Sequence, residues 1–162
     1  MKVFTSSEQQ RLKRRNLLSK IVKLNKEWRV TFEAKPTSFK DQLCSVFHMT
    51  IGGRAARPAV WFHKSKGILV GAYFNGNQSF LKTFEGLPET GEWVKIEISQ
   101  EKAGTQNIFT ISINGEEKFA EENTKAEEFS NVQVFASSPF FIAQKGLIRN
   151  VVVENKEEGK KN

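Results

Sequence analysis

The sequence has very few of the residues from which most metal and catalytic sites are built. Among 162 residues there is one cysteine, Cys44, one aspartate, Asp41, and two histidines, His48 and His63. A single cysteine excludes an internal disulfide. Calcium needs several oxygen ligands, mostly from acidic side chains, and zinc needs Cys and His at spacings that are absent here. We therefore predict that the protein holds no metal and no other cofactor.

The carboxylates are not arranged as sugar hydrolysis requires. A glycoside hydrolase needs two carboxyl groups about 5–10 Å apart, which on a strand means acidic residues two or four positions apart facing a groove. Asp41 has no such neighbour, and the glutamates at 116–117 and 121–122 flank a hairpin among lysines, as on a solvated strand edge. Cys44 and His48 lie four residues apart, on one face of a strand but too distant for easy proton transfer. We predict no catalytic residues and a protein that is not an enzyme.

The distribution of hydrophobicity and charge argues against two further classes of protein, those that span a membrane and those that bind specific nucleic-acid sequences. No apolar run approaches the roughly 18 residues of a membrane-spanning helix, so we predict no membrane span. The net charge is +7. Residues 1–29 contain nine Lys or Arg and two Glu, whereas the rest of the chain has 16 basic and 16 acidic residues. A folded nucleic-acid-binding face carries its charge in the body of the protein, so we predict no sequence-specific nucleic-acid binding.

The chain divides into three parts. Residues 1–16 are polar and basic and predict a flexible arm. Residues 9–18, which overlap its end, allow a short basic helix without a clear apolar face. Residues 155–162 predict a charged C-terminal tail, and 17–154 form the folded body. The cations of the N-terminal segment could contact acidic lipid, nucleic acid or a polyanionic glycan, although a solubilising or linker role is the default.

The body shows the period of two that is typical of strands. Trp28, Val30, Phe32 and Ala34 alternate with polar residues, and the same pattern recurs about ten times with turn signals at spacings of about 8–12 residues, as in a β-sandwich. The predicted strands are 28–35, 43–51, 59–63, 68–74, 80–84, 93–100, 108–113, 116–121, 131–136 and 146–153.

These patterns also predict the hairpin and the core. Asn114-Gly115 is the strongest hairpin signal, because both residues tolerate the positive φ of a type I′ turn. The stretch from 43 to 51 is apolar on both faces, as in a strand buried between layers. The predicted inward-facing residues are Val30, Phe32, Phe47, Met49, Ile51, Ile96, Ile98, Ile111, Val132, Val134 and Val151.

Several stretches together resemble a known kind of domain. LNKEWRVTFEAKPTSF, HMTIGG, PAVWFHKSKG, GEWVKIEISQ, FTISINGEE and NVQVFASSPFFIAQKGLIRNVVVE resemble the concanavalin A-like, laminin-G-like lectin-type domains of uncharacterised marine invertebrate proteins. The resemblance spans roughly 17–154 and implies an antiparallel two-sheet, jelly-roll β-sandwich. In related domains the loop before the Trp-Phe-His strand is longer and holds an Asp, whereas Gly52–Pro58 has none, so a ligand or ion site there would be lost in this chain.

The resemblance and the aromatic content favour a module that binds carbohydrate. Sugars stack their apolar faces on aromatic rings while amides and charged groups bind the hydroxyls. Trp61 and His63 share one face of their strand, and two phenylalanines follow Pro139 in a loop, where large apolar rings are less expected. The candidate ligand-binding residues are Trp61, His63, Tyr73, Asn75, Asn77, Phe140 and Phe141, with Arg57 and Gln78 as further polar partners. For each, packing within the fold is the competing interpretation.

Two functions remain open. One is a non-catalytic module that recognises glycans or glycoconjugates, and the other is a protein-interaction or adhesion module of a larger extracellular protein. An exposed patch at Phe140 and Phe141 would favour a protein partner, and a groove floored by Trp61 or Tyr73 would favour a glycan. The resemblance implies an extracellular location, whereas the N-terminal residues lack the apolar core of a secretory signal, as in a cytoplasmic protein or a fragment. The sequence does not indicate an oligomeric state.

Overall fold

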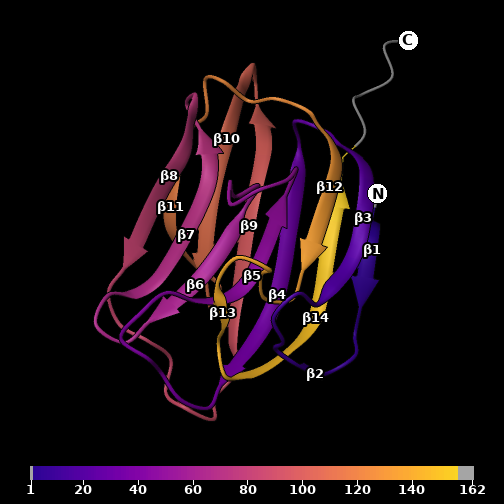
Figure 1. Cartoon of the computed structure of the whole chain (residues 1–162). Helices are drawn as coiled ribbons and strands as arrows, with labels where there is room; N and C mark the ends of the chain where they lie inside the picture. The colour runs from indigo at the N-terminus through magenta and orange to yellow at the C-terminus, as the bar shows by residue number, and fades with distance from the viewer. Residues whose placement is uncertain (1, 157–162) are drawn as a thin grey trace.

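Strands, and no helices, make up the part of the chain that the computed structural model describes, residues 2–156. They form two sheets that pack face to face, the antiparallel β-sandwich expected from the sequence (Figure 1). Sheet A runs in the order β1 (Lys2–Ser6), β14 (Gly146–Asn155), β4 (Trp28–Pro36), β9 (Val94–Ala103), β10 (Gln106–Ile113) and β11 (Glu116–Glu122), with β2 (Gln10–Arg11) also paired to β14. Sheet B runs in the order β3 (Leu17–Leu24), β12 (Phe129–Phe135), β5 (Cys44–Thr50), β6 (Ala59–His63), β7 (Gly67–Phe74) and β8 (Asn77–Phe84), with the short β13 (Ile142–Ala143) parallel to β5.

Aromatic rings from both sheets fill the space between them. Phe32 of sheet A stacks on Phe47 of sheet B, with 4.9 Å between ring centroids. Phe109 of β10 contacts Trp28 of its own sheet at 6.2 Å and Phe74 of β7 at 5.6 Å. The predicted inward-facing residues are buried, as expected, except for one. Ile51 is 46% exposed, because β5 ends at residue 50 and Ile51 begins a surface loop.

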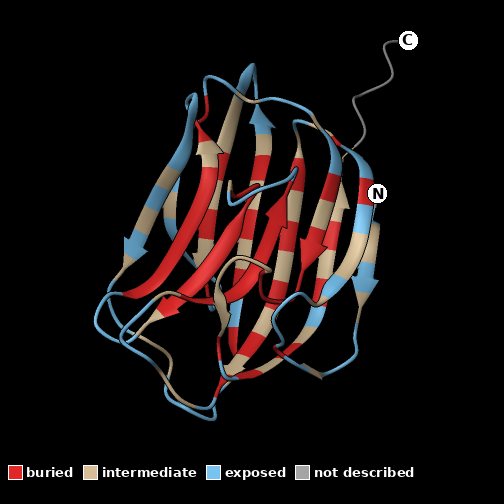
Figure 2. Cartoon of the chain, in the orientation of Figure 1, coloured by how far each residue is buried: buried red, intermediate tan, exposed pale blue. Residues whose placement is uncertain are grey.

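The two sheets differ in how their outer faces are covered. Strands β4, β9 and β14 alternate between buried and partly exposed residues, so sheet A has one face in the core and one facing solvent. Strands β5, β6 and β7 are instead buried along almost their whole length, as Figure 2 shows. A segment from 136 to 145, which includes β13, is hydrogen-bonded along the edge of β5. Its Phe140 and Phe141 rings pack over the outer face, on His48 and Trp61.

The hairpin predicted at Asn114-Gly115 is confirmed. Asn114 has a φ of 51° and Gly115 a φ of 80°, and the two residues join β10 to β11. Both values lie in the left-handed region that a type I′ turn requires.

The N-terminal segment is ordered, which corrects the prediction of a flexible arm over residues 1–16. Residues 2–6 form β1 and pair with the far end of β14, and residues 10–11 pair with its beginning. Leu12 is only 5% exposed and packs in the core, so apolar burial as well as backbone pairing fixes the segment. The suggested helix over 9–18 is absent: residues 10–11 form β2, residues 17–18 begin β3, and the chain between them turns. Of the predicted C-terminal tail, Asn155 belongs to β14 and 157–162 lie outside the described residues.

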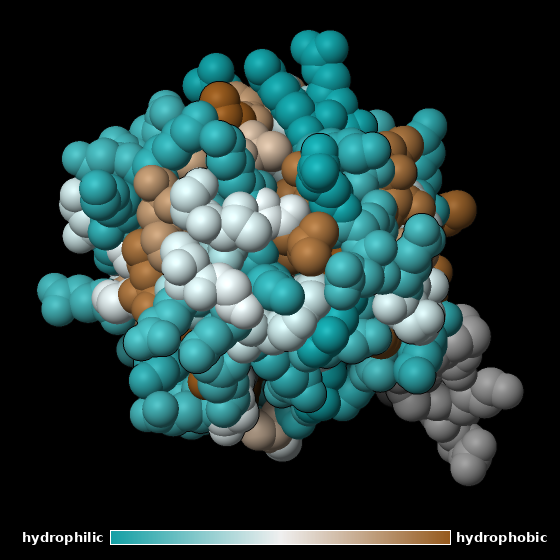
Figure 3. Space-filling model, turned by 90° about the horizontal axis from the view of Figure 1, so that it is seen from below, coloured by the Kyte–Doolittle hydropathy of each residue, from teal (hydrophilic) through white to brown (hydrophobic). Residues whose placement is uncertain are grey.

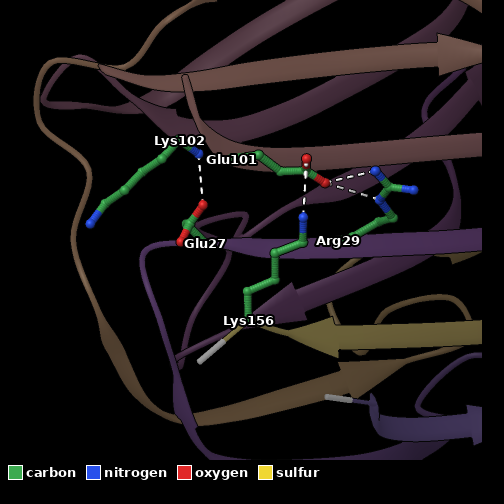
Figure 4. A network of polar contacts seen from close by, with 5 residues as sticks. All are labelled: Glu27, Arg29, Glu101, Lys102 and Lys156. Carbon is green, nitrogen blue, oxygen red and sulfur yellow. Dashed lines mark hydrogen bonds and ion pairs between the residues drawn. The ribbon is translucent and has the colours of Figure 1, made fainter. Parts of the chain in front are cut away.

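A polar network connects the end of β14 to β4 and β9 (Figure 4). The carboxylate of Glu101 on β9 accepts hydrogen bonds from Arg29 Nε at 3.2 Å and Nη2 at 2.7 Å, and Lys156 Nζ lies 3.1 Å from its other oxygen. Glu27 Oε1 accepts a hydrogen bond from the backbone N–H of Lys102 at 2.7 Å. Burial opposes ionisation of Glu101, but these cationic donors outweigh it and lower the pKa of the carboxyl group.

We expect Glu101→Gln to lower the free energy of unfolding by about 1 kcal/mol at neutral pH, since the network is partly exposed. A carboxyl group with a lowered pKa in the folded state stabilises the fold above its ordinary pKa, and this contribution disappears as the pH falls through the lowered value. The difference between wild type and variant in urea unfolding should therefore vanish in acid. Glu117→Gln, which changes an exposed carboxylate on β11, is the control, and an equal loss in both variants would contradict the role of the network.

Candidate functional site

An aromatic cluster lies on the outer face of sheet B, beneath the 136–145 segment. Trp61 of β6 contacts Phe141 at 5.4 Å between centroids and His48 of β5 at 5.8 Å. His48 in turn lies 6.1 Å from Phe140 and 6.3 Å from Phe141. The structure thus brings together three of the candidates proposed from the sequence, around a histidine that was not among them.

The side chain of Trp61 is positioned by a glycine on the next strand. Its ring lies over Gly71, where a Cβ atom would fall 2.8 and 2.9 Å from two ring carbons. Only glycine at this position leaves room for the indole. Trp61 is 6% exposed, and its Nε1 has no hydrogen-bond partner among the described residues. Its indole is therefore mostly a packed wall rather than an open platform.

A groove of about 450 Å³ lies beside this cluster. Phe141, Trp61 and Leu81 give it apolar walls, and Leu81 is 49% exposed. Polar groups at its rim come from the 51–58 loop and from β8. The residues that line it are Leu43, Arg54, Ala55, Ala56, Trp61, Gly71, Gln78, Ser79, Phe80, Leu81 and Phe141.

A buried arginine fixes one polar group of this rim. Arg57 is 4% exposed and lies between the rings of Tyr73 and Phe129, at 5.0 and 4.8 Å from their centroids. Its Nη2 donates to Gln78 Oε1 at 2.9 Å and its Nη1 to the carbonyl of Ala56 at 2.9 Å. Loss of hydration on burial lowers the pKa of Arg57. Arg57 thus holds Gln78 in place at the groove.

The remaining candidates from the sequence lie outside the groove. Tyr73 packs against Arg57 and Phe129 instead of facing the groove. Asn75 lies in the turn between β7 and β8, where its Oδ1 accepts the backbone N–H of Thr124 at 2.7 Å. Asn77 Oδ1 accepts the backbone N–H of Ser79 at 2.9 Å. The Asn75 oxygen thus joins the β7–β8 turn to the segment after β11, and the Asn77 oxygen makes a local turn bond. Both amides serve the packing of the fold, which is the competing interpretation given above.

His63 belongs to a turn that superficially resembles a catalytic triad. Its Nδ1 lies 3.5 Å from Asp41 Oδ1, and the hydroxyl of Ser65 donates to the same carboxylate. A serine nucleophile would instead need its hydroxyl hydrogen-bonded to the histidine. Here His63 Nδ1 accepts the backbone N–H groups of Ser65 at 3.2 Å and Lys66 at 3.3 Å. The arrangement orders the β6–β7 turn and does not activate Ser65.

A β-bulge separates the two residues that the sequence placed on one face. The pairing of β5 with β6 shifts between Ser45 and Phe47. As a result Cys44 pairs with Phe62, on the core side, whereas His48 pairs with Ala59, on the outer side. The prediction that Cys44 and His48 share a face is therefore wrong. Within residues 2–156, no three His, Cys, Asp or Glu side chains gather as a metal site would require.

His48 is a fully buried histidine between the 136–145 segment and the 51–58 loop. Neither ring nitrogen has a hydrogen-bond partner among the described residues. Loss of hydration lowers the pKa of His48 from its ordinary value to about 4. The nearby backbone of Ala55 and Arg54 opposes this shift without making a hydrogen bond of good geometry. The imidazole is therefore neutral at physiological pH and acts as an apolar ring in the cluster.

Comparison with known proteins gives the fold but no family. No protein-family model matches the chain, and no curated protein matches its sequence. Among solved structures it is similar to a SAP-like pentraxin from Limulus polyphemus, with 13% identity, a TM-score of 0.59, and 87% of this chain and 70% of that chain covered. The receptor-binding domain of botulinum neurotoxin type G gives 15% identity, a TM-score of 0.62, and 98% and 41% coverage. The Caenorhabditis elegans galectin LEC-6 gives 10% identity, a TM-score of 0.51, and 91% and 96% coverage.

These neighbours are β-sandwich, lectin-like domains, so the fold class inferred from the sequence is confirmed. At such low identity they establish the fold alone. Within the described residues, no helix is both long enough and apolar enough to cross a membrane.

Sequence reasoning missed most of the residues that line the groove, because only Trp61, Phe141 and Gln78 were among its candidates. Arg54 and Ala56 come from the 51–58 loop, whose path over the sheet depends on long-range packing. Gly71 could have been identified from the sequence, because a glycine inside a strand often marks the close approach of another group.

We expect Gly71→Ala to destabilise the fold by about 1–3 kcal/mol, since the new methyl group would collide with the Trp61 ring. In a Trp61→Leu background the same substitution should cost much less, because the colliding ring atoms are gone. A double-mutant cycle of urea unfolding measures this coupling. Strictly additive losses would show that the indole does not occupy the space over Gly71.

The buried histidine predicts a pH dependence of stability. Unfolded His48 takes up a proton near its ordinary pKa, whereas the folded form stays neutral down to about pH 4. Stability is therefore lost as the pH falls between these values, by about 2 kcal/mol from pH 7 to pH 5. His48→Met should lack this part of the loss, and His63→Gln should retain it. Equal pH dependence of wild type and His48→Met in urea unfolding would exclude His48 as its source.

Proposed function

We propose that the chain is a non-catalytic binding module that recognises carbohydrate in the groove beside Trp61 and Phe141. The observation that carries the proposal is the combination of aromatic and aliphatic walls with an amide, a hydroxyl and a guanidinium among the lining residues of one groove. A sugar ring has apolar C–H faces and a hydroxyl edge, and this groove offers partners for both. Its volume of about 450 Å³ lies within the range typical of small-molecule sites.

The polar rim is pre-organised for such a ligand. Gln78 is held by Arg57, so its amide loses little rotational freedom on binding. Arg54 lies over the Phe141 ring at 5.9 Å, which places a second donor next to the aromatic wall. Ser79 and Leu81 project from β8 into the same groove. The likeness to a galectin sandwich supports this function at the level of the fold.

The alternative of a protein-interaction module has less support. It was expected to show an exposed aromatic patch at Phe140 and Phe141. Both rings are half-buried and pack on His48, so the loop presents them to the sheet. A hydrolase would need a pair of facing carboxylates, and none of the residues described as lining the groove is acidic.

A glycan array followed by calorimetry on the purified chain tests the proposal. We expect binding to a neutral oligosaccharide that persists at raised salt. Ser79→Arg should block the groove and reduce the affinity by about tenfold or more, equivalent to about 1.4 kcal/mol. Phe141→Ala should weaken binding as well, because it removes an aromatic wall.

Thr83→Arg is the matched control, since it introduces the same side chain at an exposed position on the same face of the same strand. It should bind as wild type does. Equal losses in Ser79→Arg and Thr83→Arg would place the site elsewhere. The absence of binding to every neutral glycan on the array would favour a protein partner instead.

A further inference from the structure

The ordered N-terminal segment presents a cluster of unpaired cations, here called the basic loop: Arg11, Lys13, Arg14, Arg15 and Lys145. The first four lie within five consecutive residues, and Lys145 immediately precedes the strand to which β2 pairs. All five are exposed. None takes part in an ion pair within residues 2–156. Five of the basic residues that give the chain its positive net charge are therefore concentrated at one place, without an ion-pair partner among the described residues.

The backbone of the basic loop is held rigidly. The N–H of Leu12 donates to Gly146 O at 2.9 Å, and the N–H of Ala136 donates to Asn16 O at 3.0 Å. Arg15 adopts a φ of 63°, which turns the chain back toward sheet B. Arg14 donates from Nε and Nη2 to the carbonyl of Pro139, both at 3.3 Å. A charged ligand would therefore meet a fixed array of cations and would not have to order a flexible arm.

A pocket of about 460 Å³ opens between Arg11 and Lys145. Thr37 supplies a hydroxyl, and Ala143 and Leu147 supply an apolar wall. None of the described residues that line it is acidic. An anionic group that also carries C–H surface would match this combination of cations, hydroxyl and apolar wall.

The residues around the basic loop favour some classes of anionic ligand over others. No aromatic residue lies within the basic loop or lines the pocket among the described residues, so stacking of nucleic-acid bases has no platform. The end of the sandwich to which β2 belongs is seen in Figure 3, and its surface is mostly hydrophilic with apolar groups in separate small patches. A bilayer or a protein interface would be expected to meet a broader apolar area.

We propose that the basic loop and the pocket between Arg11 and Lys145 bind an acidic oligosaccharide, with one sulfate or carboxylate in the pocket and further anionic groups along Lys13, Arg14 and Arg15. This site is separate from the groove beside Trp61. It depends on the proposed function only in taking the ligand to be a saccharide.

Calorimetry with a heparin-derived oligosaccharide as the probe tests this site. We expect binding by wild type that weakens steeply as salt is raised, since the Debye length falls to about 3 Å at 1 M. Arg11→Gln/Lys145→Gln should reduce the affinity by about tenfold or more. Lys102→Gln/Lys125→Gln removes the same charge at exposed positions elsewhere on the molecule and should change the affinity by less than about twofold.

Equal effects of the two double variants would overturn the proposal, as would equal binding of an oligosaccharide that has been both desulfated and carboxyl-reduced. Tighter binding to a DNA duplex or to phosphatidylserine vesicles than to the heparin oligosaccharide would also overturn it. Ser79→Arg should keep heparin binding, and Arg11→Gln/Lys145→Gln should keep the binding of neutral glycans. The failure of one site is thereby distinguished from the failure of the other.

Discussion

The central strands of sheet B are apolar on both faces, and this constraint shapes the rest of the structure. Their inner face meets sheet A through contacts such as that of Phe47 with Phe32. Their outer face carries the apolar residues Trp61, Ala59 and Leu69. These side chains would contact water if nothing covered them. The 136–145 segment and the 51–58 loop cover that face only in part. The groove lies where this cover ends, so the candidate site follows directly from the way in which the sheet is buried.

Much of the fold could be predicted from the sequence because strands that are half-buried alternate. The predicted strand 28–35 is one residue short of β4, whose residues alternate between buried and partly exposed along its whole length. β1 and β3 were not recognised as strands, since a basic and partly exposed edge strand has little hydrophobic alternation. In β3, Ile21 is 5% exposed whereas its neighbour Val22 is 81% exposed, so apolar residues lie on both faces and do not mark the buried one.

The candidate site could be predicted in its composition but not in its arrangement. Trp61 and Phe141 stood out as aromatic residues, yet their contact joins positions 80 residues apart (141 − 61) and depends on the path of a long segment. The β-bulge in β5 had no sequence signal, and it moved His48 to the outer face and Cys44 to the core. Asn75 and Asn77 have residue types suited to binding sugars, but the same amides also bond backbone N–H groups within the fold. In the structure Asn77 does so inside its own turn and Asn75 does so to Thr124 of a distant segment.

The two proposed sites have different physical bases. In the groove, affinity would come from desolvated apolar contact and from amides held in place, and it would be insensitive to salt. At the basic loop, affinity would come from cations without ion-pair partners among the described residues, and dissolved salt would weaken it by screening. With both sites, the module would bind a saccharide chain through its sugar rings and through its acidic groups.

A two-dimensional NMR titration with the neutral oligosaccharide that binds best on the array tests the central claim most directly. The account predicts that amide shifts concentrate at Ala55, Gly71, Ser79, Leu81 and Phe141, together with the indole N–H of Trp61. Shifts confined to the outer face of sheet A or to the basic loop, with the Trp61 indole unchanged, would contradict it.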